Sequence, residues 1–280
     1  MTTTTPHTEP ALATSKQGND DKRRPSVPRS VAQRTVDRLQ SGYRQNDAAA
    51  VAAVARLRRE AGRDLYTSPS SWGLEYLDDL VRLREQRRLE DHGSSDPSPH
   101  LSHRIRLRQE QQEEREERAV HLAVTLWALH QQSIRDHPMH VSGWSLGRAV
   151  RRLADGGTGA QDEPARPSAD NRATDRGVHA DSPVRTRFVR IGTSVDFDML
   201  GRRLREMVLL LRNARIPLDY GLLAEQLCHW QDEALQGSVR RSWGRDFHRF
   251  HQISPANDEE ETPSASAART PDASLDDVGE

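Results

Sequence analysis

Apolar residues recur every three or four positions along much of this 280-residue chain, and no segment shows the alternation of β-branched and polar residues that marks a strand. This spacing places apolar side chains on one face of a helix, which must then pack against other helices. The sequence therefore predicts an all-α fold built as a helix bundle. The helices are predicted around Val36, Leu39 and Tyr43; AAAVAAVARLRRE, capped by Asn46 or Asp47; Trp72, Tyr76 and Leu80; Ala119 to Leu129, a buried central helix; Leu146, Val150 and Leu153; Phe188 to Ile191; Leu200, Leu204, Val208 and Leu211; Asp219, as a cap, to Trp230; and Val239, Trp243, Phe247 and Phe250.

The predicted helices form two small blocks that are separated and flanked by polar segments. These segments are rich in Thr, Pro, Gly, Ser and charge, a composition that favours disorder and long loops. We expect a disordered N-terminal tail at 1–28, an N-terminal helical block at 29–154 with a polar insertion at 91–113, a disordered linker at 155–183, a C-terminal helical bundle at 184–252 and a disordered acidic tail at 253–280.

Positive charge is carried almost entirely by arginine, since Lys16 and Lys22 are the only lysines among 41 basic residues. The net charge of −1 hides an uneven distribution, because residues 255–280 hold eight acids and one base, a net charge of −7. A basic body with an acidic tail suits a polyanionic partner, and arginine brings bidentate geometry to phosphate. A bias toward GC-rich codons explains the preference for arginine equally well.

Three predicted helices turn rows of arginine away from their apolar stripes, at about 100° per residue. Such rows can follow a phosphate backbone without reading bases, or they are simply solvated helix faces. The rows are Arg148, Arg151 and Arg152; Arg202, Arg205 and Arg212; and Arg241, Arg245 and Arg249, with Arg185, Arg187 and Arg190 nearby. Arg58 differs, because it falls within the arc of Val51, Val54 and Ala55, while Arg56 and Arg59 point away. A buried arginine needs a partner, so Arg58 either forms an internal ion pair or reaches a ligand through an interface.

Motifs for catalysis, metal binding and cofactors are weak in this sequence. Gly143 to Gly147 matches G-x-S-x-G, but no strand precedes it as a hydrolase elbow requires, so Ser145 is better interpreted as a helix cap. His137 and His140 flank Pro138 and have no clustered Cys or acid ligands nearby. We expect no catalytic residue, no metal and no cofactor. The stretch Leu222 to Phe247 could pass for a helix-turn-helix, but it has no tight glycine turn.

Location in the cytoplasm is the expectation from composition. No stretch approaches the ~18 apolar residues that span a bilayer, and the start of the chain lacks the features of a secretion signal. Cys228 is the single cysteine, which excludes an internal disulfide framework, and its apolar neighbours indicate a buried side chain.

Several motifs, taken in order and spacing, resemble the CasB family, the small subunit of Cascade, the type I-E CRISPR surveillance complex. The similarity runs from about Ala48 to His251, apart from 91–113 and 155–183, which look like insertions. The matching motifs are Leu57-Arg58-Arg59, the helix Leu122 to His130, Gly143 to Ala149, Arg187 to Arg190, Ile216 to Tyr220 with Leu223, Ala224 and Trp230, and Val239 to Phe247.

The resemblance implies a non-catalytic, all-α subunit that pairs with a second copy of itself beside the backbone and large subunits of Cascade. Its basic surfaces would support crRNA and target DNA, while base pairing reads the sequence. It points to Arg58, Arg59, Arg148, Arg187, Arg190, Arg202 and Arg203, and the row on the helix of Arg148 adds Arg151 and Arg152. A stand-alone helical DNA-binding regulator is the alternative, and an α/β hydrolase would rest on G-x-S-x-G alone.

Overall fold

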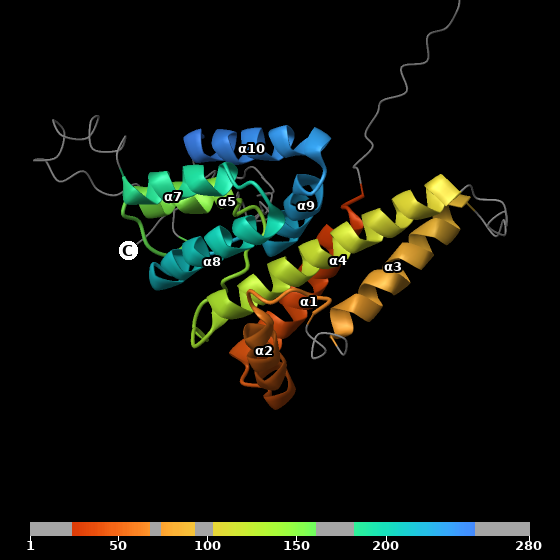
Figure 1. The fold of residues 1–280 in the computed structure, drawn as a ribbon. Coiled ribbons are helices and arrows are strands. Elements are labelled where there is room, and N and C mark those ends of the chain that lie inside the picture. Colours follow the sequence, from red (N-terminus) through yellow and green to blue (C-terminus); the bar gives the residue numbers. More distant parts are fainter. Residues whose placement is uncertain (1–23, 68–73, 93–102, 161–181, 250–280) are drawn as a thin grey trace, which may run out of the picture.

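The computed structural model describes residues 24–67, 74–92, 103–160 and 182–249, and within these ranges it is built from helices (Figure 1). The prediction of an all-α fold is confirmed. One isolated bridge pairs His140 with Leu218 outside the helices. The helices are α1 (Val27–Arg44), α2 (Ala48–Glu60), α3 (Glu75–His92), α4 (His103–Gln131), α5 (Leu146–Ala154), α7 (Pro183–Gly192), α8 (Phe197–Asn213), α9 (Tyr220–Trp230) and α10 (Glu233–His248).

Side-chain caps fix where several helices begin, because each cap accepts a hydrogen bond from an N–H that lacks a partner within the helix. Asp47 accepts from the N–H of Ala50 and so is the cap of α2, the choice that the sequence left open. Ser145 caps α5 and Asp219 caps α9, as predicted. Asp196 and Asp232 do the same for α8 and α10. Prolines in the first turn begin α1 and α7.

The second half of α4 is the centre of the fold. Its side chains from Ala119 to Gln131 are buried, apart from the half-buried Leu122, as the apolar run AVHLAVTLWAL predicts. Helices α1, α2, α8 and α9 pack around it. One hydrophobic cluster joins Val36, Trp127, Leu204 and Leu227, so residues from both sides of the predicted linker share a core.

The polar segment 91–113, predicted as an insertion, is helical wherever the structure describes it. Asp91 and His92 end α3, and residues 103–113 form the first turns of α4. This stretch lacks an apolar stripe because its side chains lie in solvent, but arginine, glutamine and glutamate favour helices. Pairs one turn apart add support, as when the amide of Gln109 donates to Glu113 at 3.1 Å.

Other predictions fall partly or wholly outside the described residues. Most of the tails at 1–28 and 253–280 and of the linker at 155–183 lies there, as do Trp72 and Phe250. The first helix begins at Val27, two residues before the predicted start of the N-terminal helical block at residue 29.

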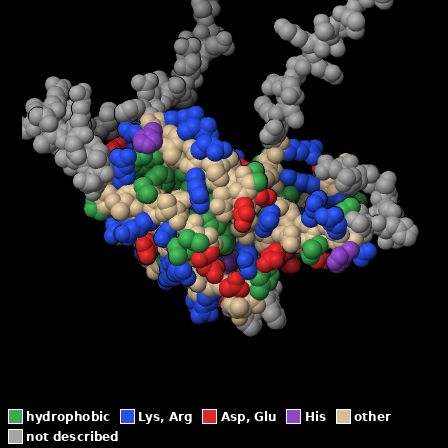
Figure 2. All heavy atoms as spheres, turned by 45° about the horizontal axis from the view of Figure 1, so that its top comes forward, with side chains coloured by type: hydrophobic (Ala, Val, Ile, Leu, Met, Phe, Trp, Pro, Cys, Tyr) green, Lys and Arg blue, Asp and Glu red, His purple; other side chains and the backbone are tan. Residues whose placement is uncertain are grey.

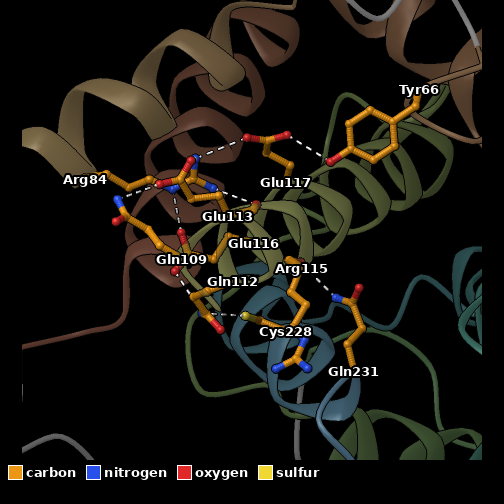
Figure 3. Close-up of polar contacts among 10 residues, drawn as sticks. All are labelled: Tyr66, Arg84, Gln109, Gln112, Glu113, Arg115, Glu116, Glu117, Cys228 and Gln231. Carbon is orange, nitrogen blue, oxygen red and sulfur yellow. Dashed lines mark hydrogen bonds and ion pairs between the residues drawn. The ribbon is translucent and has the colours of Figure 1, made fainter. Parts of the chain in front are cut away.

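An arginine on α3 holds this helix to α4 (Figure 3). The Nε of Arg84 lies 2.7 Å from a carboxylate oxygen of Glu116, and its Nη1 lies 3.1 Å from Glu117. Its Nη2 donates to the backbone oxygen of Glu113 at 2.8 Å. The side chains of Arg84 and Glu116 are only 16% and 12% exposed, which makes this the best-sheltered arginine–carboxylate pair among the described residues.

Candidate nucleic-acid interface

The start of α5 is fixed by contacts with the start of α9. The carboxylate of Asp219 accepts from the N–H of Leu222 at 2.9 Å, as a cap, and from the N–H of Gly143 at 2.8 Å. The N–H of Asp219 donates to the backbone oxygen of Trp144 at 2.7 Å. Since Ser145 then caps α5, this network sets the direction in which α5 and its arginines leave the core.

Gly147 lets α5 lie directly against the backbone of α10. A Cβ at this position would lie 2.6 Å from the nitrogen of Phe247 and even closer to the backbone oxygen of Trp243. No side chain fits there. This close approach buries Leu146, Ala149 and Val150, and it leaves the three arginines of α5 at the edge of the contact.

Arg148 lies along the protein surface and not free in solvent. Its guanidinium carbon is 4.1 Å from the centre of the Trp144 ring, a cation–π contact. Its Nη1 also contacts the backbone oxygen of Gly143 at 3.5 Å. The side chain is half-buried, so its charge is held in one place with little freedom left to lose on binding an anion.

Arg151 and Arg152 donate hydrogen bonds to the backbone of neighbouring segments. Nη1 of Arg151 donates to the backbone oxygen of Phe247 at 3.1 Å, and its Nε lies 3.4 Å from the carboxylate of Asp155. Nη2 of Arg152 donates to the backbone oxygen of Thr158 at 3.2 Å. Both side chains are half-buried, so this row is less exposed than an outward-facing helix surface would be.

Helices α7 and α8 pack against α5 and bring four more predicted arginines to the same end of the molecule. Arg187, Arg190 and Arg202 are exposed. Arg203 is half-buried, and its Nη1 donates to the backbone oxygen of Arg190 and to the hydroxyl of Ser194. The row predicted on α8 is divided, because Arg205 donates to the backbone oxygen of Ala61 at 2.8 Å and Arg212 to that of Gln132 at 3.2 Å.

The prediction that Arg58 turns toward the core is wrong. Arg58 and Arg59 are both exposed, and the buried side chains of α2 are Ala50, Val54, Leu57 and Glu60. The alanines spread weak apolar character around this helix, so the spacing did not locate the centre of its buried face. Helix α2 packs on α1 and α4, away from α5, α7 and α10 (Figure 1). The structure therefore places Arg58 and Arg59 away from the arginines of α5 and α7, and it brings Arg205 of α8 to the end of α2 at Ala61.

Comparison with known proteins identifies the family of this chain. Residues 53–248 match the family model described as CRISPR-associated protein Cse2. The chain belongs to the Cse2 family. Solved relatives include CasB from Thermobifida fusca, with 39% identity and a TM-score of 0.56, covering 80% of this chain and 98% of that chain. The resemblance to CasB found in the sequence is confirmed.

Two further solved structures are more distant. CasB from Thermus thermophilus is 20% identical, with a TM-score of 0.44, covering 77% of this chain and 96% of that chain. A structure described as a CRISPR RNA-guided surveillance complex contains a chain that is 22% identical, with a TM-score of 0.48, covering 79% of this chain and 93% of that chain. No match was found among curated proteins.

The part that matches the Cse2 family contains all nine predicted arginines, and the structure sorts them into two places. Arg148, Arg151, Arg152, Arg187, Arg190, Arg202 and Arg203 form what we call the α5–α7–α8 surface; Arg58 and Arg59 lie on α2. The spacing of the sequence did not predict the stacking of Arg148 on Trp144. Trp144 precedes the helix cap Ser145, so helical geometry does not fix the position of its ring. In the view of Figure 2, basic side chains are spread over much of the surface, and acidic ones gather in its middle and lower part.

The serine of G-x-S-x-G has a structural role in this Cse2 chain. Ser145 is buried, and its hydroxyl accepts from the N–H of Arg148 at 3.4 Å. Within the described ranges, no group of three His, Cys, Asp or Glu is placed to hold a metal ion. Nor is any helix in those ranges both long and apolar enough to cross a membrane. Cys228 is buried as predicted, and burial raises the pKa of its thiol to about 11.

Proposed function

We propose that this protein is a non-catalytic small subunit of the type I-E CRISPR surveillance complex Cascade, acting in the cytoplasm in antiviral defence. It supports crRNA and target DNA through arginine-rich helix faces and leaves sequence reading to base pairing. The observation that carries the proposal is the α5–α7–α8 surface, where seven arginines meet in a chain of the Cse2 family. One solved structure with a similar chain is itself described as an RNA-guided surveillance complex.

The chemistry of this surface favours phosphate over bases. Arginine presents a planar fork of donors that matches phosphate oxygens, and helix-mounted guanidinium groups can follow a backbone. Arg187, Arg190 and Arg202 are exposed and can reach a strand, while Arg148 is held against Trp144. Such contacts give affinity that is indifferent to sequence and falls steeply with salt.

Partners other than nucleic acid follow from the same assignment. A small subunit of Cascade would contact the backbone and large subunits and a second copy of itself. Arg58 and Arg59 lie on α2, apart from the α5–α7–α8 surface, so we assign them to a second nucleic-acid contact. A single nucleic-acid strand that contacts both α2 and the α5–α7–α8 surface would have to run along the protein surface between them.

The test is the salt dependence of binding to single-stranded RNA and DNA of scrambled sequence, measured by fluorescence anisotropy. The double variant Arg187→Gln/Arg190→Gln removes two exposed charges, so the slope of log K against log salt should fall by about 0.7 per lost contact. Arg82→Gln/Arg88→Gln on α3 is the matched control, since it removes the same charge from another exposed surface and should bind as the wild type does. Equal affinities and slopes for the two double variants would refute the assignment.

A stand-alone DNA-binding regulator is the second candidate. The observation in its favour is that α9 and α10 are separated by only Gln231 and Asp232, as in a compact helix pair. However, Trp243 of α10 is buried and donates to Gln226 of α9 at 2.7 Å, so one face of α10 is committed to the core. Tight binding to one duplex sequence, with weak binding to RNA, would favour the regulator.

A further inference from the structure

Helix α10 carries a row of exposed arginines that the proposed interface does not use. Arg241, Arg245 and Arg249 follow one another at intervals of one turn, and all three are exposed. Within the part of the chain that the structure describes, no carboxylate lies within 4.0 Å of these three guanidinium groups. We call Arg241, Arg245 and Arg249 the α10 row. Its three charges are therefore open to an anion from outside the described residues.

Helix α10 lies beside α7, one of the helices of the α5–α7–α8 surface. The rings of Phe188 on α7 and Phe247 on α10 stack with centroids 5.2 Å apart. Nη2 of Arg240 contacts the backbone oxygen of Ser194, just beyond α7, at 3.5 Å. These two contacts run in opposite order along the two helices, so α10 lies antiparallel to α7. Arg240 and Phe247 mark the side of α10 that meets α7. At about 100° per residue, Arg241, Arg245 and Arg249 lie on the other side of α10, so the α10 row faces away from α7.

The chain itself supplies an anion of suitable charge directly after α10. The segment 255–280 holds eight acids and one base, and four of the acids are consecutive, from Asp258 to Glu261. Asp258 is nine residues beyond Arg249, the last residue of the α10 row.

The length of the connection permits the acids to reach back over the row. Nine residues can span at most about 30 Å, whereas the eight steps from Arg241 to Arg249 cover about 12 Å of helix. A short tether of this kind gives an effective concentration in the millimolar range, which lets individually weak surface ion pairs act together. Such binding remains partial and sensitive to salt.

We propose that the acidic segment 255–280 binds the α10 row of its own chain and competes there with nucleic acid. The contact between tail and row stands on charge and length alone, whereas the competition rests on the function proposed above. The tail would lower the affinity of the free subunit for unrelated RNA and DNA. A long nucleic-acid strand, which carries more charge and releases counterions, would displace it.

The first experiment tests the contact without any nucleic acid. A nitroxide spin label on Thr262→Cys reports on the tail, because Cys228 is buried and does not compete for the label. We expect paramagnetic broadening of backbone amides along α10, strongest around Arg241 and Arg245. It should decrease to the level given by the tether alone at 0.5 M salt and in the variant Asp258→Asn/Glu259→Gln/Glu260→Gln/Glu261→Gln. Broadening that is the same in the neutralised variant would overturn the proposal.

The second experiment separates docking from general repulsion between a negative tail and nucleic acid. Neutralising the four acids should raise the affinity for single-stranded RNA about three- to tenfold at low salt. The same change in a chain that also carries Arg241→Gln/Arg245→Gln should give no gain, because the docking surface is already lost. An equal gain in both backgrounds would contradict docking. If neither chain binds nucleic acid, the proposed function fails while the spin-label result still decides the contact.

Discussion

The phenol oxygen of Tyr220 lies 2.8 Å from Nδ1 of His130, and both side chains are fully buried. The bond joins the end of α4 to the first residue of α9. It therefore connects the central helix to the segment that positions α5.

Removing this hydroxyl should be costly. Tyr220→Phe leaves Nδ1 of His130 without its partner in a site that water does not reach, so we expect the free energy of unfolding to fall by about 1–3 kcal/mol. Chemical denaturation at pH 7 measures this. The control is Tyr66→Phe, whose hydroxyl bonds to Glu117 at an exposed position and should cost under about 1 kcal/mol. Equal losses in the free energy of unfolding for the two variants would show that the buried hydrogen bond contributes no more than the exposed one.

Stability should decrease as the pH falls below neutrality. Burial, with a contribution from Arg212, lowers the pKa of His130 from 6.5 to about 3 in the folded chain. Below pH 6.5 the unfolded chain therefore binds a proton that the folded chain does not, and unfolding is favoured by up to about 1.4 kcal/mol per pH unit for this group. Burial also lowers the pKa of His121, which acts in the same direction.

Denaturation curves between pH 7 and pH 5 check this slope. His130→Gln should make the dependence on pH shallower, because one of the two histidines whose pKa is lowered by burial no longer titrates on unfolding. His229→Gln changes an exposed histidine and should retain the slope of the wild type. A slope unchanged in His130→Gln would contradict the prediction.

Arg84 should contribute more to stability than other ion-paired arginines on α3. Arg84→Gln leaves Glu116, which is 12% exposed, and Glu117 without their countercharge, and we expect a loss of about 2–3 kcal/mol, below the loss for a fully buried pair. Arg88→Gln breaks the exposed pair with Glu85 and should cost under about 1 kcal/mol. Thermal unfolding of the two variants makes the comparison, and similar melting temperatures would refute it.

Two glycines in helices should respond to alanine in opposite ways. In Gly147→Ala the new Cβ meets the backbone of α10, so α5 and α10 must separate, and the expected change is a destabilisation of at least about 3 kcal/mol. In Gly244→Ala nothing lies within 4 Å, and the variant should gain about 0.5–1 kcal/mol from helix propensity. Urea denaturation gives both values. A stable Gly147→Ala would mean that α5 and α10 are not in the described contact.

The sequence predicted those parts of the fold that depend on local chemistry. Asp47, Ser145 and Asp219 are caps because their side chains bond to the backbone a few residues away. The stripe from Leu200 to Leu211 is buried because four strongly apolar residues define one face of α8.

The arginine contacts could not be predicted in the same way. Arg205 donates to Ala61, 144 residues away, and Arg151 to Phe247, 96 residues away. Only the packing of helices brings these atoms together. Arg58 was misplaced for a related reason, since the alanines of α2 left its buried face undefined until α1 and α4 covered it.

The 29-residue helix α4 has two halves with different exposure, and this has an evolutionary consequence. Residues 103–112 are exposed and precede the Arg84 contacts, whereas the buried half begins near Ala119. Removing or adding about seven residues in the exposed half changes the length of α4 by about two full turns. The side chains before and after the change then keep their directions around the helix axis. Insertions and deletions of that size can therefore accumulate among homologues at this end, while the core and the arginine surfaces keep their form.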